Sequence, residues 1–425
     1  MVFEHDALHR TADNGRRRRL LLLLCGVLLA GASTQPAAGQ VAAGPVPAGP
    51  AAATRGMSVS GAALYKDGIR FYPRGFNSLA LVQPDACAAA RKSQIPTVAQ
   101  ATWSSSHLST IMSIWRINTI RFQVSQPGLD PQLDPGHPEL LGGQPAYLNR
   151  IKSVVATARA KHLFVILSMQ EQHYACGYKH PLPSSRTLRA WQALAPAFAG
   201  NRYVAFELYN EPDVPATADS WTQWRDGGDT PTANVSRDDG SLYDVVGHQQ
   251  LVTAVRALGV QNVLIADSVM EGFTLRNLWT SSTQNYLLLD TLSPAQIAYA
   301  IHPYAFHVAD NSTYATDHSF WQVNFGYVRD RLKIDTAHQF PVISTEWNAS
   351  ATGCCKVGEA KRTPSFLTYL QGLDIGLLAH AVDVPGLLVT AVPGYRPNTF
   401  STGGGECSSG SGAGTVLQAF FSKAP

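Results

Sequence analysis

Eight short apolar runs alternate with longer stretches of mixed polarity along most of this chain. The runs are Tyr72–Asn77, Thr119–Val124, Leu163–Met169, Tyr203–Tyr209, Val263–Asp267, Ala298–His302, Val342–Thr345 and Ile375–Val382. Amphipathic segments between them, such as Tyr147–Lys161 and Tyr243–Leu258, predict helices. Near-continuous apolar strands are typical of a parallel sheet buried on both faces. Eight such strands alternating with helices predict an α/β fold of the (β/α)8 TIM barrel type.

The segments around the barrel have different patterns. Residues 33–56 are mostly Ala, Pro and Gly and predict a linker without core-forming capacity. Val59–Tyr72, with Lys66, Asp67 and Gly68 at its turn, predicts a small hairpin that closes the barrel floor. Residues 401–414 are rich in Gly and Ser and predict a surface loop. We therefore expect one catalytic barrel domain over residues 57–425.

Residues 1–32 have the pattern of an export signal. Arg16–Arg19 form a basic region, Leu20–Ala30 a short apolar region, and Ala30–Ala32 a small-x-small cleavage pattern. The paired arginines also permit a twin-arginine signal, and an uncleaved anchor is the alternative. We expect a secreted or periplasmic protein without stable membrane association after signal removal.

Charge and composition narrow the possible partners. Of the net charge of +3, residues 1–32 contribute +2, because they hold five arginines and three acids. The remaining chain is close to neutral, and charged residues make up only 15% of the whole, which argues against a nucleic-acid-binding surface and suits a neutral ligand. We expect a monomer. No nucleotide-binding, HExxH or GxSxG motif occurs, so we expect no cofactor and no metal.

The cysteines predict disulfides if the protein is exported. Five remain besides Cys25, and no His/Cys spacing resembles a zinc site. We expect Cys87 to pair with Cys176, and Cys407 with Cys354 or Cys355, which leaves one thiol.

Two of the predicted strands end in a carboxylate. Asn210, Glu211 and Pro212 follow one apolar run, and Glu346 follows another. The carboxyl ends of barrel strands meet at one face, where barrel enzymes have their active sites. Two carboxyl groups from separate strands are what glycoside hydrolysis requires.

A series of strand-end motifs resembles glycoside hydrolase family 5, the cellulase-type retaining glycosidases. The resemblance covers most of residues 58–400. The motifs are Arg74–Asn77, Ile120–Phe122, Phe206–Pro212, Ile301–Tyr304 and Ser344–Trp347.

The resemblance implies Glu346 as the nucleophile and Glu211 as the acid/base. Retaining hydrolysis gives the same roles, with the two carboxyl groups about 5 Å apart. We expect the pKa of Glu211 to be raised, in part by the charge of Glu346.

Other motif residues supply expected contacts. Arg121 and Tyr304 would donate to Glu346, although an ordinary barrel ion pair or rim packing is the alternative. His302 would lie near the acid or the sugar, and Asn210 near the sugar 2-hydroxyl. Asn77 is expected to support them from behind.

Glu207 is a further acid on the strand that leads to Glu211. Strand alternation places Glu207, Tyr209 and Glu211 on one face. We expect Glu207 to form a structural ion pair with Arg121 or Arg74.

The chain departs from the family pattern at two strand ends. Where the family has a histidine after the third strand, Gln170 or His173 would substitute. Where it has a tryptophan after the eighth, this chain has His380, and Trp347 would replace the lost sugar-stacking surface. Trp221 and Trp224 are expected in a loop near the sugar.

These features predict an exported retaining β-glycoside hydrolase for a β-linked glucan or mannan-type polysaccharide or oligosaccharide. Two alternatives use the same fold: a non-catalytic glycan-binding barrel and a transglycosylase.

Overall fold

The computed structural model describes residues 55–82, 103–132, 144–170, 180–228, 242–281, 283–304, 318–349, 363–399 and 413–423. All of them belong to one compact unit, Pro50–Pro425. The predicted export signal, the linker up to residue 54, every cysteine, His173 and nearly all of the loop 401–414 lie outside the described residues.

Eight parallel strands of the described chain close into a barrel, in the order β10-β11-β4-β5-β6-β7-β8-β9. They are β4 Arg74–Ser78, β5 Thr119–Ser125, β6 Phe164–Gln170, β7 Val204–Glu207, β8 Leu264–Asp267, β9 Ile297–Ile301, β10 Val342–Ser344 and β11 Gly376–Ala379. Each corresponds to one predicted apolar run, with ends that differ by a few residues. The predicted (β/α)8 barrel is confirmed.

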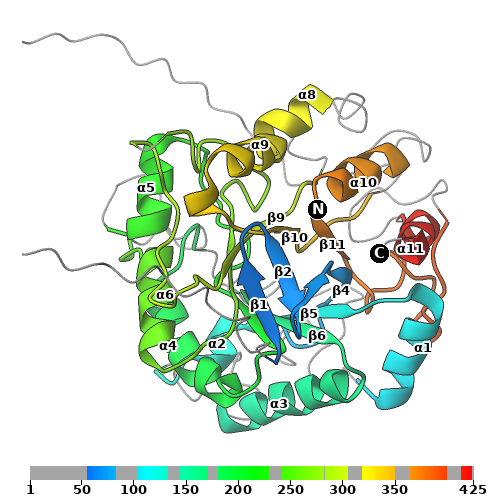
Figure 1. The fold of residues 1–425 in the computed structure, drawn as a ribbon. Coiled ribbons are helices and arrows are strands. Elements are labelled where there is room, and N and C mark those ends of the chain that lie inside the picture. The colour runs from blue at the N-terminus through cyan, green and yellow to red at the C-terminus, as the bar shows by residue number, and fades with distance from the viewer. Residues whose placement is uncertain are drawn as a thin grey trace, which may run out of the picture. The chain divides into compact units, whose positions relative to one another are not determined.

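A small antiparallel sheet closes the end of the barrel at which the strands begin. It consists of β1 Met57–Ser60, β2 Ala63–Lys66 and β3 Ile69–Phe71. Its buried Met57, Val59 and Leu64 join the apolar cluster inside the barrel. Figure 1 shows this sheet, in blue, across the middle of the ring of helices.

The predicted hairpin is therefore part of a three-stranded sheet. Its turn follows the expected chemistry, because Asp67 and Gly68 have φ values of 54° and 80°. A two-residue hairpin turn with both φ values positive favours Asp-Gly. The predicted segment, from Val59 on, includes the second half of β1. This strand begins at Met57, whose amide donates to the Arg202 carbonyl at 2.9 Å.

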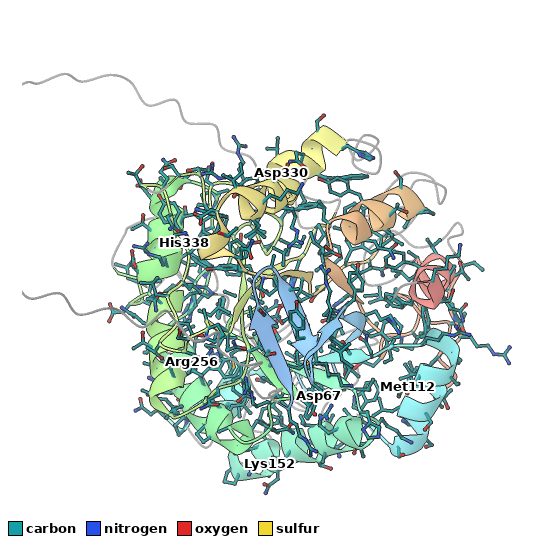
Figure 2. All side chains as sticks on the ribbon, in the orientation of Figure 1. Asp67, Met112, Lys152, Arg256, Asp330 and His338 are labelled. Carbon is teal, nitrogen blue, oxygen red and sulfur yellow. The ribbon has the colours of Figure 1, made fainter. Side chains whose placement is uncertain are left out.

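Helices surround the barrel (Figure 1). They are α1 Ser105–Trp115, α2 Gln126–Leu129, α3 Gln144–Ala160, α4 Ser185–Leu194, α5 Ala218–Asp226, α6 His248–Ala257, α8 His318–Trp321, α9 Tyr327–Ile334, α10 Thr363–Gly372 and α11 Gly414–Lys423. Shorter elements are the 3-10 helices η2 Ala195–Phe198 and η5 Thr336–His338 and the π-helix η4 Gln322–Gly326. Lys152 on α3 and Asp330 on α9 lie at the outer edge of this ring in Figure 2. None of these described helices combines the length and apolarity needed to cross a membrane.

Side-chain caps and strand-like bridges set several helix boundaries. Ser104 accepts from the amide of His107 at 3.2 Å and so starts α1. The helix predicted from Tyr243 begins only at His248, because Val245 and Val246 form bridges with distant segments instead.

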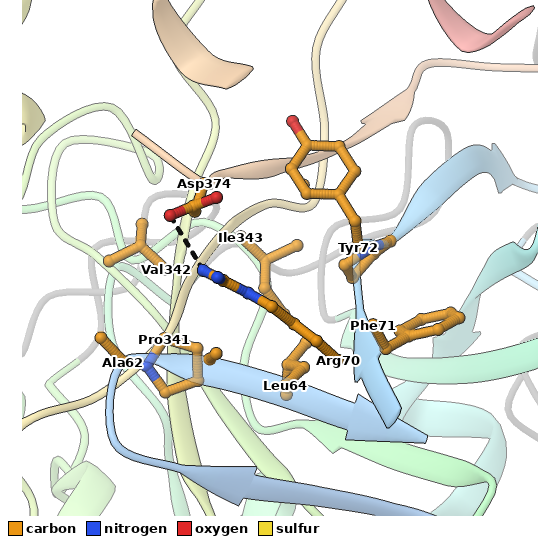
Figure 3. A pocket seen from close by; sticks show the side chains of 12 residues that line it. Ala62, Leu64, Arg70, Phe71, Tyr72, Pro341, Val342, Ile343 and Asp374 are labelled. Carbon is orange, nitrogen blue, oxygen red and sulfur yellow. Dashed lines mark ion pairs between the residues drawn. The ribbon is translucent and has the colours of Figure 1, made fainter. Parts of the chain in front are cut away.

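A cavity of about 340 Å³ lies at the barrel floor (Figure 3). It is lined by residues that precede or begin strands, such as Pro73 and Pro341, together with Leu64 of the floor sheet. The Arg70–Asp374 ion pair, 2.9 Å long and half-exposed, lies along it. The predicted catalytic residues follow the opposite ends of the strands, so this cavity is separate from them.

Candidate active site

Arg121 of β5 is the centre of the candidate site. Its side chain is fully buried, and all five of its N–H groups donate to oxygen atoms. The acceptors are Glu207, Asn77, Glu346, Ser168 and Asn210. A planar guanidinium can hold this many partners in fixed directions, so Arg121 sets the positions of side chains from several strands.

Glu346 follows β10, and its two carboxylate oxygens have separate partners. Arg121 Nη1 and Gln123 Nε2 donate to Oε2 at 2.8 and 2.9 Å. The Tyr304 hydroxyl donates to Oε1 at 3.0 Å, and His380 Nδ1 lies 3.2 Å from the same oxygen. Only 7% of the Glu346 side chain is exposed.

Glu211 faces the same space, from the loop after β7. Its φ of 55° is left-handed, and its amide donates to Asp267 Oδ2 at 3.1 Å. Its Oε1 contacts His302 Nδ1 at 3.0 Å, and its Oε2 accepts from Asn210 Nδ2 at 3.1 Å. At 16% exposed, Glu211 is the more accessible of the two glutamates.

The expectation that Glu207, Tyr209 and Glu211 share one strand face was wrong. β7 ends at Glu207, and the Tyr209 hydroxyl donates to the His180 carbonyl instead of entering the site. The left-handed backbone at Glu211 lets Asn210 and Glu211 reach the site as neighbours. Glu207 forms the expected buried ion pair with Arg121.

Buried acids surround His302, which follows β9. Its Nε2 contacts the Thr345 hydroxyl at 2.9 Å and lies 3.5 Å from Asp267 Oδ2. Thr345 in turn donates to Glu207 at 2.6 Å. Burial alone disfavours the imidazolium, but Asp267, Glu207 and Glu211 outweigh it and raise the pKa of His302 to about 10.

The two glutamates have opposite pKa shifts. Burial and the charge of Glu346 raise the pKa of Glu211 above its usual range, against the effect of His302. Burial also acts against ionisation of Glu346, but His380, His302 and Arg121 outweigh it and hold its pKa below the usual range. Two carboxyl groups with opposite pKa shifts therefore lie side by side. One oxygen of each and a nitrogen of His302 are all within 4.8 Å of one another.

The remaining predicted site residues differ in their placement. Asn77 supports Arg121 from behind, as it accepts from Nη1 at 2.5 Å and donates to the Thr345 carbonyl at 2.9 Å. His380 comes directly after β11, and its side chain is 14% exposed beside Glu346. Gln170 ends β6 and is buried, whereas its proposed equivalent His173 is outside the described residues.

The structure corrects the expectation for Trp347. This side chain is fully buried and packs against Phe366 of α10, with ring centroids 5.2 Å apart. It points outward between the barrel and the helices, so it offers no surface to a sugar.

The expectation for Trp221 and Trp224 was also wrong. They lie on α5 instead of in a loop, and both are fully buried. Their indole nitrogens donate to the main-chain carbonyls of Arg276 and Asp267. They hold the helix against the barrel.

Sequence reasoning missed three polar residues of the site: Gln123, Asp267 and Thr345. Simple signals were present for each. Gln123 is two residues after Arg121 on the same strand face. Asp267 ends a predicted strand, and Thr345 directly precedes Glu346.

Among the residues that the structure describes, two groups of side chains have the composition of a cation site. They are Glu207 with Asp267 and His302, and Glu211 with His302 and Glu346. A divalent cation at either group would be repelled by Arg121, which already neutralises Glu207 and Glu346. The expected absence of a metal remains a prediction.

The fold and this geometry define a class: a barrel protein with two unequal carboxyl groups at the carboxyl ends of its strands, which is the arrangement of glycoside hydrolysis. A model of the cellulase family, glycosyl hydrolase family 5, matches residues 88–382, more than half of the chain. The chain belongs to this family and is a glycoside hydrolase. A comparison with curated proteins found no match to this chain.

Solved structures share the fold at low sequence identity. A triple mutant of the endo-β-1,4-glucanase Xac0030 from Xanthomonas axonopodis pv. citri is 18% identical, with a TM-score of 0.51 over 83% of this chain and 100% of its own. The endo-β-1,4-glucanase Xac0029 from the same organism is 17% identical, with a TM-score of 0.50 over 83% and 98%. A β-mannanase from Thermomonospora fusca is 15% identical, with a TM-score of 0.45 over 77% and 84%.

Proposed function

We propose that the protein is an exported retaining β-glycoside hydrolase with Glu346 as nucleophile and Glu211 as acid/base. The observation that carries the proposal is the pair of opposite pKa shifts on carboxyl oxygens within 4.8 Å. Double displacement requires one ionised and one protonated carboxyl group about 5 Å apart, whereas single displacement needs a wider gap that admits a water.

In the first step, a Glu346 oxygen attacks the anomeric carbon. The bond from that carbon to the leaving oxygen breaks, and the leaving oxygen takes the proton of Glu211. Negative charge thereby moves from Glu346 to Glu211. His302, which contacts Glu211 at 3.0 Å, is placed to stabilise the new carboxylate.

In the second step, a water oxygen attacks the same carbon while Glu211 takes one of its protons. The ester bond breaks, and its electron pair returns to Glu346. Arg121 and Gln123, at 2.8 and 2.9 Å from Oε2, stabilise the returning charge. The product keeps the anomeric configuration of the substrate.

A β-linked glucan or mannan-type glycan is the substrate class that we propose. The fold is shared with proteins described as endo-β-1,4-glucanases. Export rests on the basic and apolar pattern of residues 16–30. Expression of the full chain in an exporting host should give a protein whose N-terminus, sequenced by mass spectrometry, follows Ala32.

The first test is hydrolysis of a panel of aryl β-glycosides, β-glucan and β-mannan, with NMR of the first-formed anomer. We expect a β product. A 2-deoxy-2-fluoro glycoside should add mass to a peptide that contains Glu346. An α product, or a label on another acid, contradicts the mechanism.

Matched variants separate the two roles. Glu346→Gln should abolish turnover while the melting temperature is kept. Glu211→Ala should still react with a dinitrophenyl glycoside, and azide should restore turnover with a β-azide product. Asp290→Asn, which changes a buried acid paired with Arg256 elsewhere in the barrel, is the control for loss of a buried charge.

The alternatives give different results in these assays. A glycan-binding barrel would bind oligosaccharides but hydrolyse no activated glycoside. A transglycosylase would release the aryl group and form longer saccharides, which chromatography of the products detects.

A further inference from the structure

Asp267 is a buried acid that neither proposed step uses. It ends β8, and its side chain is fully buried. Its Oδ2 accepts from the Glu211 amide at 3.1 Å and lies 3.5 Å from His302 Nε2. Its carbonyl accepts from Trp224 Nε1 at 3.0 Å, which ties this residue to α5.

A single oxygen of Asp267 thus reaches Glu211 by two routes. One is direct, through the main-chain amide of a residue whose φ of 55° is unusual for a side chain of this size. The other passes through the His302 imidazole, whose Nδ1 contacts Glu211 Oε1 at 3.0 Å. The amide hydrogen bond restrains the backbone of Glu211. The 3.5 Å contact with His302, whose Nε2 is hydrogen-bonded to Thr345, acts on the Glu211 carboxyl group through charge.

The surroundings of Asp267 give it a charge-dependent role as well. It is faced by Glu207 from β7 and His302 from β9, with Arg121 of β5 close enough to act on its charge. Burial and Glu207 raise its pKa, and Asp267 in turn favours the cationic form of His302. The protonation of the imidazole that touches Glu211 therefore depends on Asp267.

We propose that Asp267 is a positioning residue for Glu211, acting through the Glu211 amide and through His302. The inference rests on the proposed acid/base role of Glu211. In this role, Asp267 aligns the Glu211 carboxyl group with the leaving oxygen and does not contact the substrate itself.

The test compares leaving groups in Asp267→Leu and Asp267→Asn. A poor leaving group such as phenol needs the proton of Glu211, whereas dinitrophenol leaves without it. For Asp267→Leu, kcat/KM on the phenyl β-glycoside should fall about 100-fold and on the dinitrophenyl glycoside no more than about threefold. Asp267→Asn keeps an oxygen that can accept from the Glu211 amide, so its loss should be smaller.

Asp290→Asn is the control, because it removes a buried acid whose partner is Arg256. It should lower the melting temperature without changing the dependence on the leaving group. Equal losses on both substrates in Asp267→Leu, or no loss, would overturn the proposal.

A second measurement does not depend on activity. The ¹³C signal of the Glu211 carboxyl carbon, assigned by its absence in Glu211→Gln, reports the titration of Glu211. Asp267→Leu removes the carboxyl group that accepts from the Glu211 amide and faces His302, so the titration midpoint of Glu211 should shift from its wild-type value. An unchanged midpoint overturns the role of Asp267, whereas a wild type that cleaves no aryl glycoside overturns only the proposed function.

Discussion

Charge at the level of single residues gives the carboxyl groups of the candidate site opposite pKa shifts. Four acids, Glu207, Glu211, Asp267 and Glu346, lie around Arg121 and His302. Burial and neighbouring acids raise the pKa values of Glu211 and Asp267. Neighbouring cations outweigh burial at Glu207 and Glu346 and lower theirs.

This charge pattern fixes the expected pH dependence. The proposed mechanism requires Glu211 protonated and Glu346 ionised. Because the pKa of Glu211 is raised, the alkaline limb should lie above the ordinary glutamate value of about 4.3. Because the pKa of Glu346 is lowered, Glu346 should cause no loss of activity until the pH falls below that value.

The prediction at this scale concerns His380. Its Nδ1 lies 3.2 Å from Glu346 Oε1, and its side chain is 14% exposed. An imidazole covers less sugar surface than an indole, so we predict weaker action on plain β-1,4-glucan than on a glycan with other polar contacts.

The variant His380→Trp tests it. The substrate profile should move towards plain β-1,4-glucan, because an indole covers more sugar surface than an imidazole. If the substrate profile stays as in the wild type, His380 does not contact the reacting sugar.

At the level of elements, the sequence predicted the strands well and the loops between them poorly. Apolar runs identify buried strands because every residue of such a strand must be buried. The run to Tyr209 was too long by a few residues, since apolarity alone does not show where hydrogen bonding to the next strand stops. Trp221 lies on a buried helix face. A search for loop aromatics could not distinguish this position from one where an indole stacks against a sugar.

The residues of the candidate site were likewise predicted well at strand ends and poorly where a loop contact places them. Glu211, Glu346, Arg121 and His302 were predicted together because strand ends meet at one face of a barrel. Asp267 reaches the site through a main-chain amide in left-handed conformation, and no periodicity in the sequence encodes that contact.

The prediction at this scale concerns the loop after β8. Gly272 has a φ of 79°, and a Cβ there would lie 2.9 Å from Cγ of His302. Gly272→Ala should displace the imidazole from Glu211 and lower kcat on a poor leaving group by about 100-fold.

Gly259→Ala is the matched control. Its φ of 75° imposes a similar backbone cost, but nothing lies within 4 Å of the added carbon. This variant should lose a similar amount of stability, about 1 kcal/mol, and keep its activity. Equal activities in the two variants would show that Gly272 does not hold His302.

At the level of the whole molecule, the two ends of the barrel have separate tasks. The carboxyl ends of the strands carry the site, and the floor sheet covers the opposite end. Residues near the floor should therefore affect stability more than catalysis, as in other barrels of this type. β1 can test this division, because it belongs to the floor sheet. It also follows directly on the segment predicted to be a linker, so it can be removed from the N-terminal side.

We predict that a chain starting at Gly56 keeps the melting temperature and kcat of the mature protein. The removed segment, residues 33–55, is rich in Ala, Pro and Gly and has little apolar surface to bury. The first contacts of the floor, from Gly56 to Asp67 and from Met57 to Arg202, are retained. A chain starting at Gly61 also loses Met57 and Val59, which are 0% and 5% exposed inside the barrel. Burial of two such side chains contributes about 4 kcal/mol, so the melting temperature should fall by about 10 °C. Calorimetry of both chains decides where the folded domain begins. A lower melting temperature for the chain starting at Gly56 would place stabilising contacts in residues 33–55. An unchanged melting temperature for the chain starting at Gly61 would show that β1 contributes little to the floor.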